Sequence, residues 1–355
     1  MAVPTTFKAA VLPEAGGKHS IEYRELSPLQ PDEVGIKITA TAINPVDWKI
    51  RDYRVFLSQY PAVLGSDAAG EVAAVGSAVT DFAVGDRVFF QGIIGKYDFS
   101  TFQQYCKMPA RLLAKTPRGI SDEQAAGISL ATLAVITGFY DKTGHGMPPP
   151  WDKGGDRAGA GKAVVVLGGS SSVGQYALQF ARLSGFTKIV TNASAAQHEY
   201  LRTLGAHVVL DRSRAGPEDF KAAVGDTPLA FVFDAISSQE TQTLGVQILR
   251  AVQAEGNYVV VVQPVDSRAA AEGEEGEPKV QIKQILGLGS SPALAYLSEP
   301  LFKHLGGEDG YIAKGLFVPN RPVVIPGGLN GLEAALARNK EGVSAQKVVI
   351  RPFDE

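Results

Sequence analysis

The stretch from Ala163 to Gly185, AVVVLGGSSSVGQYALQFARLSG, joins an apolar run to a segment of helical periodicity through a turn of glycine and serine. Ala163–Leu167 is rich in β-branched residues and is typical of a strand buried on both faces, and apolar residues recur at helical spacing from Val173 onward. Glycines in the turn let the helix start close to the strand, so that backbone N–H groups and the helix dipole face an anion. The stretch therefore predicts a binding site for the pyrophosphate of a dinucleotide.

The turn departs from the GxGxxG pattern at one position. Gly169, Ser171 and Gly174 occupy the three glycine positions, so serine replaces the middle glycine. Serine hydroxyls can donate hydrogen bonds to phosphate oxygens. We therefore expect the whole turn to bind the cofactor, through Gly168, Gly169, Ser170, Ser171, Ser172, Val173 and Gly174. The alternative is a purely structural strand-to-helix turn in an unrelated α/β protein.

The end of the next strand, Lys188 to Thr191, normally selects the dinucleotide, because an NAD site places a carboxylate there for the ribose hydroxyls. This chain has Ser194 instead, followed by His198 and, after a further strand, Arg212. A small hydroxyl with basic neighbours accepts a 2′-phosphate. The pattern predicts NADPH rather than NADH, unless His198 and Arg212 are only solvated surface residues.

Length and charge restrict the class of protein. With 355 residues the chain is longer than one core normally supports, so two domains are expected. The formal net charge of −3 and the lack of a Lys/Arg-rich run argue against nucleic-acid binding. No apolar run approaches the roughly 20 residues that span a bilayer, and the N-terminus lacks the apolar stretch of a secretory signal. We expect no membrane association and a cytoplasmic location.

The sequence offers little for a metal site. Its one cysteine, Cys106, excludes an intrachain disulfide and a four-cysteine zinc site, and its five histidines show no HxxxH or HxH spacing. We expect no metal.

Two patterns divide the chain. Residues 1–128 contain short β-type runs separated by Pro and Gly and predict an antiparallel β domain. From about residue 130, strand and helix patterns alternate, which predicts an α/β fold with a doubly wound parallel sheet. The Pro- and Gly-rich segment 144–161 is predicted to be a loop, and the acidic segment 266–279 to be solvated and mobile.

Four motifs occur in an order that resembles the medium-chain dehydrogenase/reductase superfamily. They are INPVDWKIR at 43–51, LGSDAAGEVAAVG at 64–76, VGDRVF at 84–89 and VLGGSSSVGQYALQ at 166–179. The C-terminal segment 327–350 resembles the closing helix and strand of that superfamily. Within it, the chain is most similar to the zinc-independent quinone oxidoreductase branch and to the fungal trans-acting enoyl reductases and their toxD-like relatives.

The resemblance implies a fold and an activity. It implies a GroES-like β domain, residues 1–128 completed by 305–355, and a Rossmann NADP(H)-binding domain, residues 129–304, with the active cleft between them. The implied activity is NADPH-dependent reduction of an activated C=C bond or a quinone by hydride transfer without zinc. The substrate would be a small molecule or an enoyl group carried by a partner such as a polyketide synthase.

The resemblance also implies the catalytic residues. Lys49 is the leading candidate for polarising the acceptor or contacting the nicotinamide end, because an ammonium can donate to an enolate oxygen or a ribose hydroxyl. Asn44 is expected to be functional, although Asn-Pro is also a common turn opener. Thr137 would face the nicotinamide or substrate, with helix packing as its alternative. The superfamily's zinc ligands would fall near Asn44 and near Ser66 with Asp67, and neither Asn44 nor Ser66 coordinates zinc well.

Further cofactor contacts follow from the same resemblance. They form two groups outside the glycine turn. The expected β domain contributes Val46, Asp47, Trp48, Lys49, Val343 and Ser344. The expected Rossmann domain contributes Ser194, Gln197, His198 and Arg212. Asp47 is expected to have a mainly structural role. Relatives often carry Lys at position 197 and Tyr at position 212, so this chain departs from them around the 2′-phosphate. Tyr97 and Phe99 are candidates for the substrate pocket.

Two other functions remain open from the sequence. The chain could be a noncatalytic nucleotide-binding protein, crystallin-like or scaffold-like, because it has no strong acid–base pair that would require catalysis. A zinc alcohol dehydrogenase with unusual ligands is less favoured, since the ligand types are missing. Relatives occur both as monomers and as homodimers joined through the edge of the Rossmann sheet.

Overall fold

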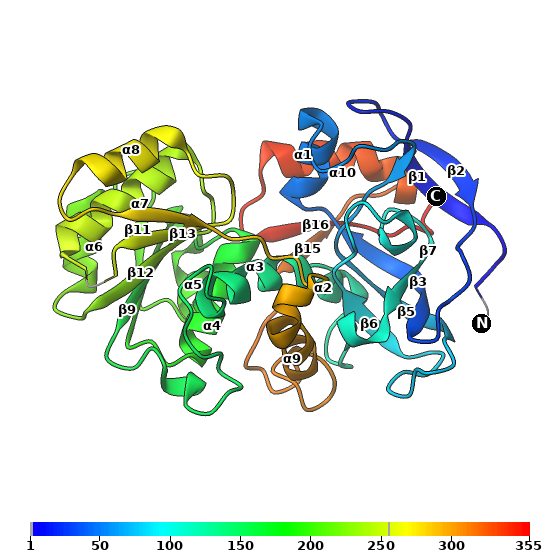
Figure 1. Ribbon diagram of the computed structural model, residues 1–355, viewed down its shortest axis with the longest axis horizontal. Coiled ribbons are helices and arrows are strands. Elements are labelled where there is room, and N and C mark those ends of the chain that lie inside the picture. The colour runs from blue at the N-terminus through cyan, green and yellow to red at the C-terminus, as the bar shows by residue number, and fades with distance from the viewer. Residues whose placement is uncertain (1–2, 255) are drawn as a thin grey trace. The chain divides into compact units, whose positions relative to one another are not determined.

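The computed structural model describes residues 3–254 and 256–355. The chain divides into two compact units (Figure 1). The first contains the chain up to Leu130 together with Gly289–Glu355, and the second contains Ala131–Leu288.

The second unit contains the expected doubly wound sheet, whose strand order is β11-β10-β9-β12-β13-β14, with every pair parallel. The strands are β9 (Ala163–Leu167), β10 (Lys188–Ala193), β11 (Val208–Asp211), β12 (Leu229–Asp234), β13 (Tyr258–Val261) and β14 (Gln281–Gln284). The helices between them are α4 (Ser172–Leu183), α5 (His198–Thr203), α6 (Pro217–Val224), α7 (Gln239–Val252) and α8 (Ser267–Glu275). The short turn η3 (Gly155–Arg157) precedes β9, and η4 (Ala195–Gln197) lies between β10 and α5. The parallel sheet predicted from the alternating pattern is confirmed.

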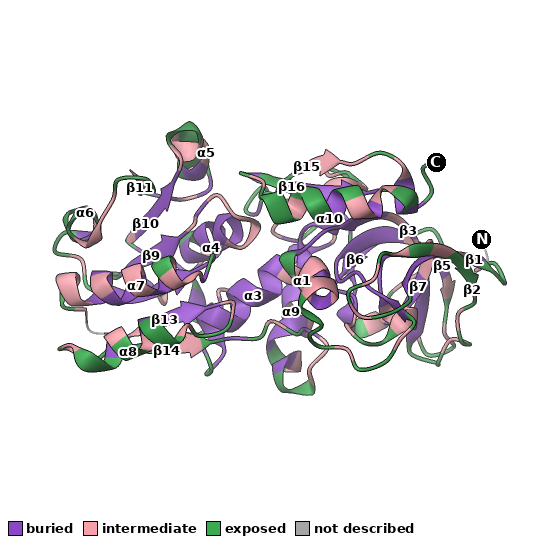
Figure 2. Ribbon diagram, turned by 90° about the horizontal axis from the view of Figure 1, so that it is seen from above, coloured by how far each residue is buried: buried purple, intermediate pink, exposed green. Residues whose placement is uncertain are grey.

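The central strand β9 shows why the apolar run forms a buried strand. All five of its residues are completely buried, as the colouring in Figure 2 shows. Ala163, Val165 and Leu167 pack with Phe220 of α6 and Val246 of α7. The alternate residues of β9 point to the other face of the sheet, because successive side chains in a strand alternate. Helix α4 also packs against β9, and the turn after β9 lies at the carboxyl edge of the sheet.

The first unit is built from two sheets. The smaller has the order β2-β1-β4, from β1 (Phe7–Leu12), β2 (Ser20–Arg24) and β4 (Ala62–Val63). The larger has the order β15-β16-β3-β5-β6-β8, with β7 also paired to β3, from β3 (Glu33–Ala42), β5 (Ala68–Val75), β6 (Arg87–Phe90), β7 (Tyr105–Pro109), β8 (Ala114–Lys115), β15 (Arg321–Val324) and β16 (Gln346–Ile350). All these pairs are antiparallel except β15 with β16.

Helices α1 (Pro45–Tyr53) and α10 (Leu332–Glu341) lie against each other in the first unit. Ile50 of α1, Leu336 of α10 and Val348 of β16 share one apolar cluster. The closing helix and strand thus complete the unit that contains α1. The remaining helical segments of this unit are α2 (Asp122–Ala126), α9 (Ala295–Leu305), η1 (Tyr97–Phe99), η2 (Ala110–Leu112), η5 (Pro292–Leu294) and η6 (Gly328–Gly331), and α3 (Ser129–Tyr140) continues from this unit into the second.

The structure differs from the sequence-based expectations at two places. The chain returns to the first unit at Gly289 rather than at residue 305, because α9 packs against β8 and η2 of that unit. The segment 266–279, expected to be solvated and mobile, contains α8, whose Ala269 and Gly273 are buried. Asp266 begins this helix and accepts hydrogen bonds from the backbone N–H groups of Arg268 and Ala269. The predicted loop 144–161 has only the short turn η3 as regular structure.

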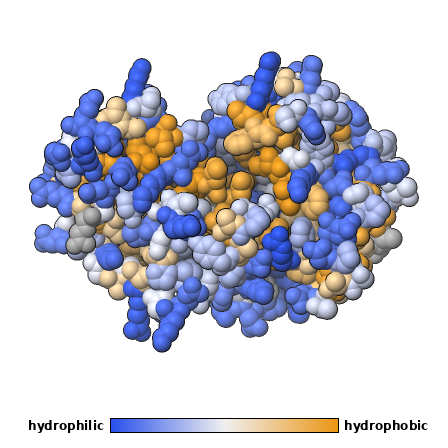
Figure 3. All heavy atoms as spheres, viewed as in Figure 1, coloured by the Kyte–Doolittle hydropathy of each residue, from blue (hydrophilic) through white to orange (hydrophobic). Residues whose placement is uncertain are grey.

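The surface carries both polar and apolar groups. On the face drawn in Figure 3, hydrophilic residues predominate and apolar residues gather in several areas. Two of the most exposed apolar side chains, Tyr53 and Phe56, lie at and just after the end of α1. Among the described residues, no helix has the length and apolar character needed to cross a membrane.

Candidate functional site

The turn between β9 and α4 can be built only with glycine at three positions. A Cβ on Gly174 would lie 2.2 Å from the carbonyl oxygen of Gly168, and one on Gly169 would lie 2.3 Å from Oγ1 of Thr191. Gly168 has a φ of +77°, and its Cβ would meet Ile236 at 2.3 Å. At these three positions the backbone lies so close to neighbouring atoms that any side chain would clash with them.

The first turn of α4 presents backbone donors. Ser171 begins the helix, and its Oγ accepts a hydrogen bond of 3.0 Å from the N–H of Gly174. The N–H groups of Ser172 and Val173, in the first helical turn, have no acceptor within the described chain. Because α4 has 12 residues, its dipole adds positive potential at these donors. This donor set fits the pyrophosphate of a dinucleotide.

Asn192 fixes the turn from the neighbouring strand β10. Its side-chain Oδ1 accepts from the N–H of Gly168 at 2.9 Å, and its carbonyl oxygen accepts from the N–H of Gly169 at 3.1 Å. Asn192 is not among the residues predicted from the sequence, although an asparagine at the end of an apolar strand run is a usable signal. Its role is to orient the two glycines that carry the turn.

A buried carboxyl group supports the same turn from β12. Asp234 has no exposed surface, and its Oδ1 accepts from the N–H groups of Ile236 and Ser237 at 3.0 and 2.8 Å. Burial raises the pKa of Asp234. These bonds fix the segment that packs Ile236 against Gly168. This contact could not be predicted from the sequence, because it depends on the pairing of β12 with β9.

The residues predicted to select the cofactor surround the carboxyl ends of β10 and β11. Ser194 begins η4 and is half-buried. The carbonyl oxygen of Ala193 accepts from the backbone N–H of Arg212 at 3.0 Å and lies 3.3 Å from Nε2 of His198. The side chain of Arg212 is exposed, and Gln197 is half-buried. The structure thus brings Ser194, His198 and Arg212 to one edge of the sheet.

One carboxylate that the sequence analysis did not weigh lies at the same edge. Asp211 pairs in register with Ala193. Its Oδ1 accepts from the backbone N–H and the hydroxyl of Ser213 at 3.0 and 2.8 Å, and the backbone bond is the main reason that its pKa lies below the usual range. The negative charge of Asp211 is therefore turned toward Ser213.

Thr137 lies within α3 and is 2 % exposed. Its hydroxyl donates to the carbonyl oxygen of Leu133, four residues earlier, at 2.7 Å. This is the helix-packing alternative stated above, and the catalytic role of Thr137 stays a prediction.

A buried polar network holds the start of α1. Lys347 of β16 donates from Nζ to Oδ1 of Asn44 at 2.5 Å and lies 3.6 Å from Oδ2 of Asp67. The amide of Asn44 also donates to Asp67, at 3.3 Å. Asp47 accepts from the backbone N–H of Asn44 at 2.7 Å and from the hydroxyl of Ser66 at 3.1 Å. The network joins the last strand, the start of α1 and the segment before β5.

Burial changes the ionisation of this network. Asp47 is 1 % exposed and Asp67 is completely buried. Desolvation raises the pKa of Asp47 to about 7 and that of Asp67 to about 6, against the lowering effects of hydrogen bonds and of the Lys347 ammonium. Burial also lowers the pKa of Lys347. Burial therefore raises the pKa of both carboxyl groups toward neutrality, although the Lys347 ammonium lies beside Asp67.

Lys49 lies on α1, one turn beyond this network, and is half-buried. Its Nζ is 5.5 Å from the centre of the Trp48 ring, and burial lowers its pKa. The indole N–H of Trp48 donates to Oδ1 of Asn339 on α10 at 3.0 Å. The position of α1 is thereby fixed from α10 as well as from β16.

Other predicted contacts of the first unit gather around α1. Val46, Trp48 and Val343 pack against the same apolar cluster, whereas Ser344 is exposed. Tyr97 also packs against this cluster and donates from its hydroxyl to the carbonyl oxygen of Gln59 at 2.6 Å. Phe99 faces the ammonium of Lys107 at 5.3 Å.

The donor set at Asn44, Ser66 and Asp67 does not suit a zinc ion. It has one carboxylate, no thiolate and no imidazole, and the ammonium of Lys347 already contacts Asn44 and Asp67. Across residues 3–254 and 256–355, no three His, Cys, Asp or Glu side chains form a group that could hold a metal.

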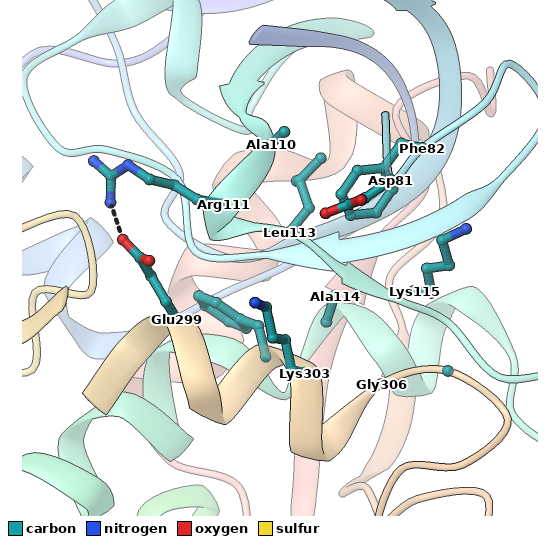
Figure 4. A pocket seen from close by; sticks show the side chains of 12 residues that line it. Asp81, Phe82, Ala110, Arg111, Leu113, Ala114, Lys115, Glu299, Lys303 and Gly306 are labelled. Carbon is teal, nitrogen blue, oxygen red and sulfur yellow. Dashed lines mark hydrogen bonds and ion pairs between the residues drawn. The ribbon is translucent and has the colours of Figure 1, made fainter. Parts of the chain in front are cut away.

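The first unit has a separate pocket of about 260 Å³ (Figure 4). Phe82, Leu113 and Phe302 form apolar parts of its wall, and Arg111 pairs with Glu299 beside it at 3.1 Å. None of the predicted site residues lines it.

Comparisons with known proteins agree with both units. Residues 30–118 match the family described as alcohol dehydrogenase GroES-like domain, and residues 172–271 match the family described as zinc-binding dehydrogenase. The chain is 31 % identical to the trans-enoyl reductase himH of Aspergillus japonicus, over 90 % of this chain and 89 % of that protein. It is 32 % identical to the chloroplastic NADPH-dependent alkenal/one oxidoreductase of Arabidopsis thaliana, over 66 % of this chain and 58 % of that protein.

A solved structure shows the same architecture over the whole chain. An alcohol dehydrogenase superfamily protein from Novosphingobium aromaticivorans superposes with a TM-score of 0.76 and 25 % identity, covering 97 % of this chain and 99 % of that one. The GroES-like and Rossmann assignments are thereby confirmed. The chain belongs to the medium-chain dehydrogenase/reductase superfamily, whose members are nicotinamide-dependent oxidoreductases, and is related to its fungal trans-enoyl reductases.

Proposed function

We propose that this protein is an NADPH-dependent reductase that transfers hydride to an activated C=C bond, or to a quinone, without zinc. The observation that carries the proposal is the start of α4. There the N–H groups of Ser172 and Val173 are open, and close contacts leave no room for a Cβ at Gly168, Gly169 or Gly174. Such a turn binds a pyrophosphate and leaves the carboxyl edge of the sheet for the rest of the cofactor.

The choice of NADPH rests on the charges at the ends of β10 and β11. Nε2 of His198 and the backbone N–H of Arg212 both lie at the carbonyl oxygen of Ala193, the Arg212 side chain is exposed there, and Ser194 stands where an NAD site has a carboxylate. A guanidinium can form two hydrogen bonds to a phosphate, whereas it gains less from a neutral hydroxyl. Asp211 keeps its negative charge at this edge, because the hydrogen bonds from Ser213 hold its pKa below the usual range, so the proposal assigns the attraction of a 2′-phosphate to the guanidinium of Arg212.

The chemistry asks little of the protein beyond position and charge. When bound, the reduced nicotinamide supplies the hydride that adds to the β-carbon of the acceptor. The electron pair of the C=C bond moves onto the conjugated carbonyl oxygen, where the ammonium of Lys49 donates a hydrogen bond to the developing charge. The half-buried position of Lys49 strengthens this interaction, since partial desolvation increases electrostatic attraction. A proton from solvent then adds to the α-carbon.

A metal is not needed for this role. The ammonium of Lys347 contacts Asn44 and Asp67, so that the cation of this network is part of the chain itself. Metal analysis of the purified protein tests this part directly. About one zinc per chain would favour an alcohol dehydrogenase with unusual ligands.

We further propose that the acceptor is an enoyl thioester presented by a synthase. The similarity to himH, named a trans-enoyl reductase, supports this choice, and that to the alkenal/one oxidoreductase supports the wider class of conjugated carbonyl acceptors. Tyr53 packs edge-on against Trp48, so apolar surface lies beside Lys49 for an acyl chain.

The proposal is tested with the purified protein, NADPH or NADH, and three acceptors. These are an enoyl thioester on a carrier protein, a free α,β-unsaturated ketone and a quinone. Oxidation of NADPH with at least one acceptor is the expected result. Tight NADPH binding without turnover on any of them would instead identify a noncatalytic nucleotide-binding protein.

A further inference from the structure

Lys347 stands apart from the predicted site residues, yet it is the cation of the network that begins α1. It comes from β16, near the end of the chain, and only 3 % of its surface is exposed. Burying an ammonium is costly unless it is paired and hydrogen-bonded. Its two partners in the network, Asn44 and Asp67, lie 303 and 280 positions earlier in the sequence.

The hydrogen bond to Asn44 determines where α1 begins. Asn44 precedes the first residue of the helix, and its side chain is hydrogen-bonded to two residues outside the helix. Its Oδ1 accepts from Lys347 and its Nδ2 donates to Asp67, while the carboxylate of Asp47 accepts from the backbone N–H of Asn44. The start of the helix is thus anchored to β16, and not only to its own first turn.

Lys49 follows five residues after Asn44, on the same short helix. A helix of nine residues is held mainly by its tertiary contacts, so the loss of a contact at its start loosens the helix that carries Lys49. We propose that Lys347 is a positioning residue, which sets the location of Lys49 by anchoring Asn44. This inference rests on the proposed role of Lys49 in reduction.

The first unit contains a matched comparison for Lys347. Lys107 is also 3 % exposed, and its Nζ lies 2.9 Å from Glu33 and donates to the carbonyl oxygen of Pro28 at 3.2 Å. It lies on β7, and both of these partners are outside the α1 network. Lys107→Met therefore removes an equally buried, paired ammonium without touching Asn44.

The experiment compares Lys347→Met, Lys107→Met and the double variant Lys347→Met with Asp67→Asn. The single variant at 347 leaves Asp67 buried without its cation, which is expected to destabilise the fold. The double variant neutralises both groups and is expected to recover thermal stability. It still lacks the donor to Asn44, and we expect its kcat to stay on the order of 10- to 100-fold below that of the wild type, with a smaller change in KM for NADPH.

Two measurements at α1 distinguish this inference from the proposed function, because neither depends on enzymatic activity. Hydrogen exchange of the peptide that covers α1 is expected to speed up in both 347 variants and to stay unchanged in Lys107→Met. Trp48 fluorescence, measured with Trp151 replaced by Phe in every variant, reports the same displacement.

Three outcomes would overturn either the positioning role of Lys347 or the proposed function. Unchanged exchange and fluorescence at α1 in the double variant would overturn the positioning role, whatever the activity. A double variant that recovers wild-type kcat along with its stability would overturn it as well, because charge balance alone would then suffice. A wild-type protein that reduces no acceptor, together with a loosened α1 in the variants, would overturn the proposed function and leave the anchoring of α1 intact.

Discussion

Lys347 and Asn44 are joined by a hydrogen bond of 2.5 Å, although 303 positions separate them in the sequence. One is near the end of the chain and the other begins α1. The contact adds to the pairing of β16 with β3, which places the closing strand in the same unit as the N-terminal β domain. It also places a positive charge where the carboxyl groups of Asp67 and Asp47 are buried.

Replacing Lys49 tests the proposed electrophilic role. Lys49→Met removes the ammonium but keeps much of the side chain's apolar length. We expect kcat to fall by about 100-fold, in the range found when a single donor to a developing oxyanion is removed. The KM for NADPH should change less, and steady-state kinetics with a conjugated ketone measures both.

Lys340 provides the control for that variant. Its Nζ lies 5.4 Å from the same Trp48 ring, and it pairs with Asp52. Lys340→Met should leave kcat within about twofold, because exposed ion pairs contribute little. Equal losses in the two variants would show that packing around Trp48, rather than the Lys49 ammonium, is responsible.

The turn after β9 is tested by adding one methyl group. In Gly174→Ala the new Cβ would lie 2.2 Å from the carbonyl oxygen of Gly168, so the turn must open. We expect NADPH binding to weaken by at least about tenfold and the melting temperature to fall. Gly216→Ala is the control, because a Cβ there meets nothing within 4 Å. Titration calorimetry measures the binding, and full affinity in Gly174→Ala would contradict the proposed cofactor site.

Cofactor choice is tested at Arg212. Arg212→Ser removes the guanidinium proposed to contact the 2′-phosphate, and kcat/KM for NADPH should fall by about 10-fold or more while that for NADH stays nearly constant. Arg214→Ser removes a second exposed arginine of the same segment and should alter neither. If the two arginine variants behave alike with both cofactors, Arg212 does not select NADPH.

The buried carboxyl groups predict how stability depends on pH. In the folded protein, the pKa of Asp47 is raised from 3.8 to about 7, so the folded state binds its proton more tightly than the unfolded state. Its contribution to stability is present at low pH and is lost as the pH rises from about 4 through about 7. Asp47→Asn should flatten the free energy of unfolding over this range, as measured by urea denaturation.

Asp52→Asn is the control, because the pKa of Asp52 is lowered whereas that of Asp47 is raised. Hydrogen bonding from Arg51 lowers the pKa of Asp52, so its contribution is present above the unfolded pKa and is lost as the pH falls. A pH profile of Asp47→Asn that matches the wild type would contradict the raised pKa.

Much of the second unit could be predicted because its signals are local. The apolar run Ala163–Leu167 needs burial on both faces, and the glycines after it leave few ways to start α4. The segment 266–279 is wrongly predicted to be solvated and mobile, because a run of acidic residues is typical both of an irregular solvated chain and of a helix. Alanine and glutamate are strong helix formers, and Asp266 supplies an N-cap, so these residues form α8.

The contacts that organise the sites depend on pairing between distant segments and could not be read from local patterns. Asn192 reaches Gly168 only because β10 lies beside β9 in parallel register. Lys347 resembles any lysine in a strand until β16 is placed next to β3. The boundary at Gly289 likewise depends on where α9 packs.

Hydride transfer itself gives the most direct test of the account. The purified protein is supplied with NADPH that carries deuterium at its reactive position, together with a carrier-bound enoyl thioester or an α,β-unsaturated ketone, and the product is analysed by mass spectrometry and NMR. The account predicts a saturated product with one deuterium on the β-carbon. A protein that binds NADPH but gives no deuterated product with these acceptors or with a quinone would contradict it.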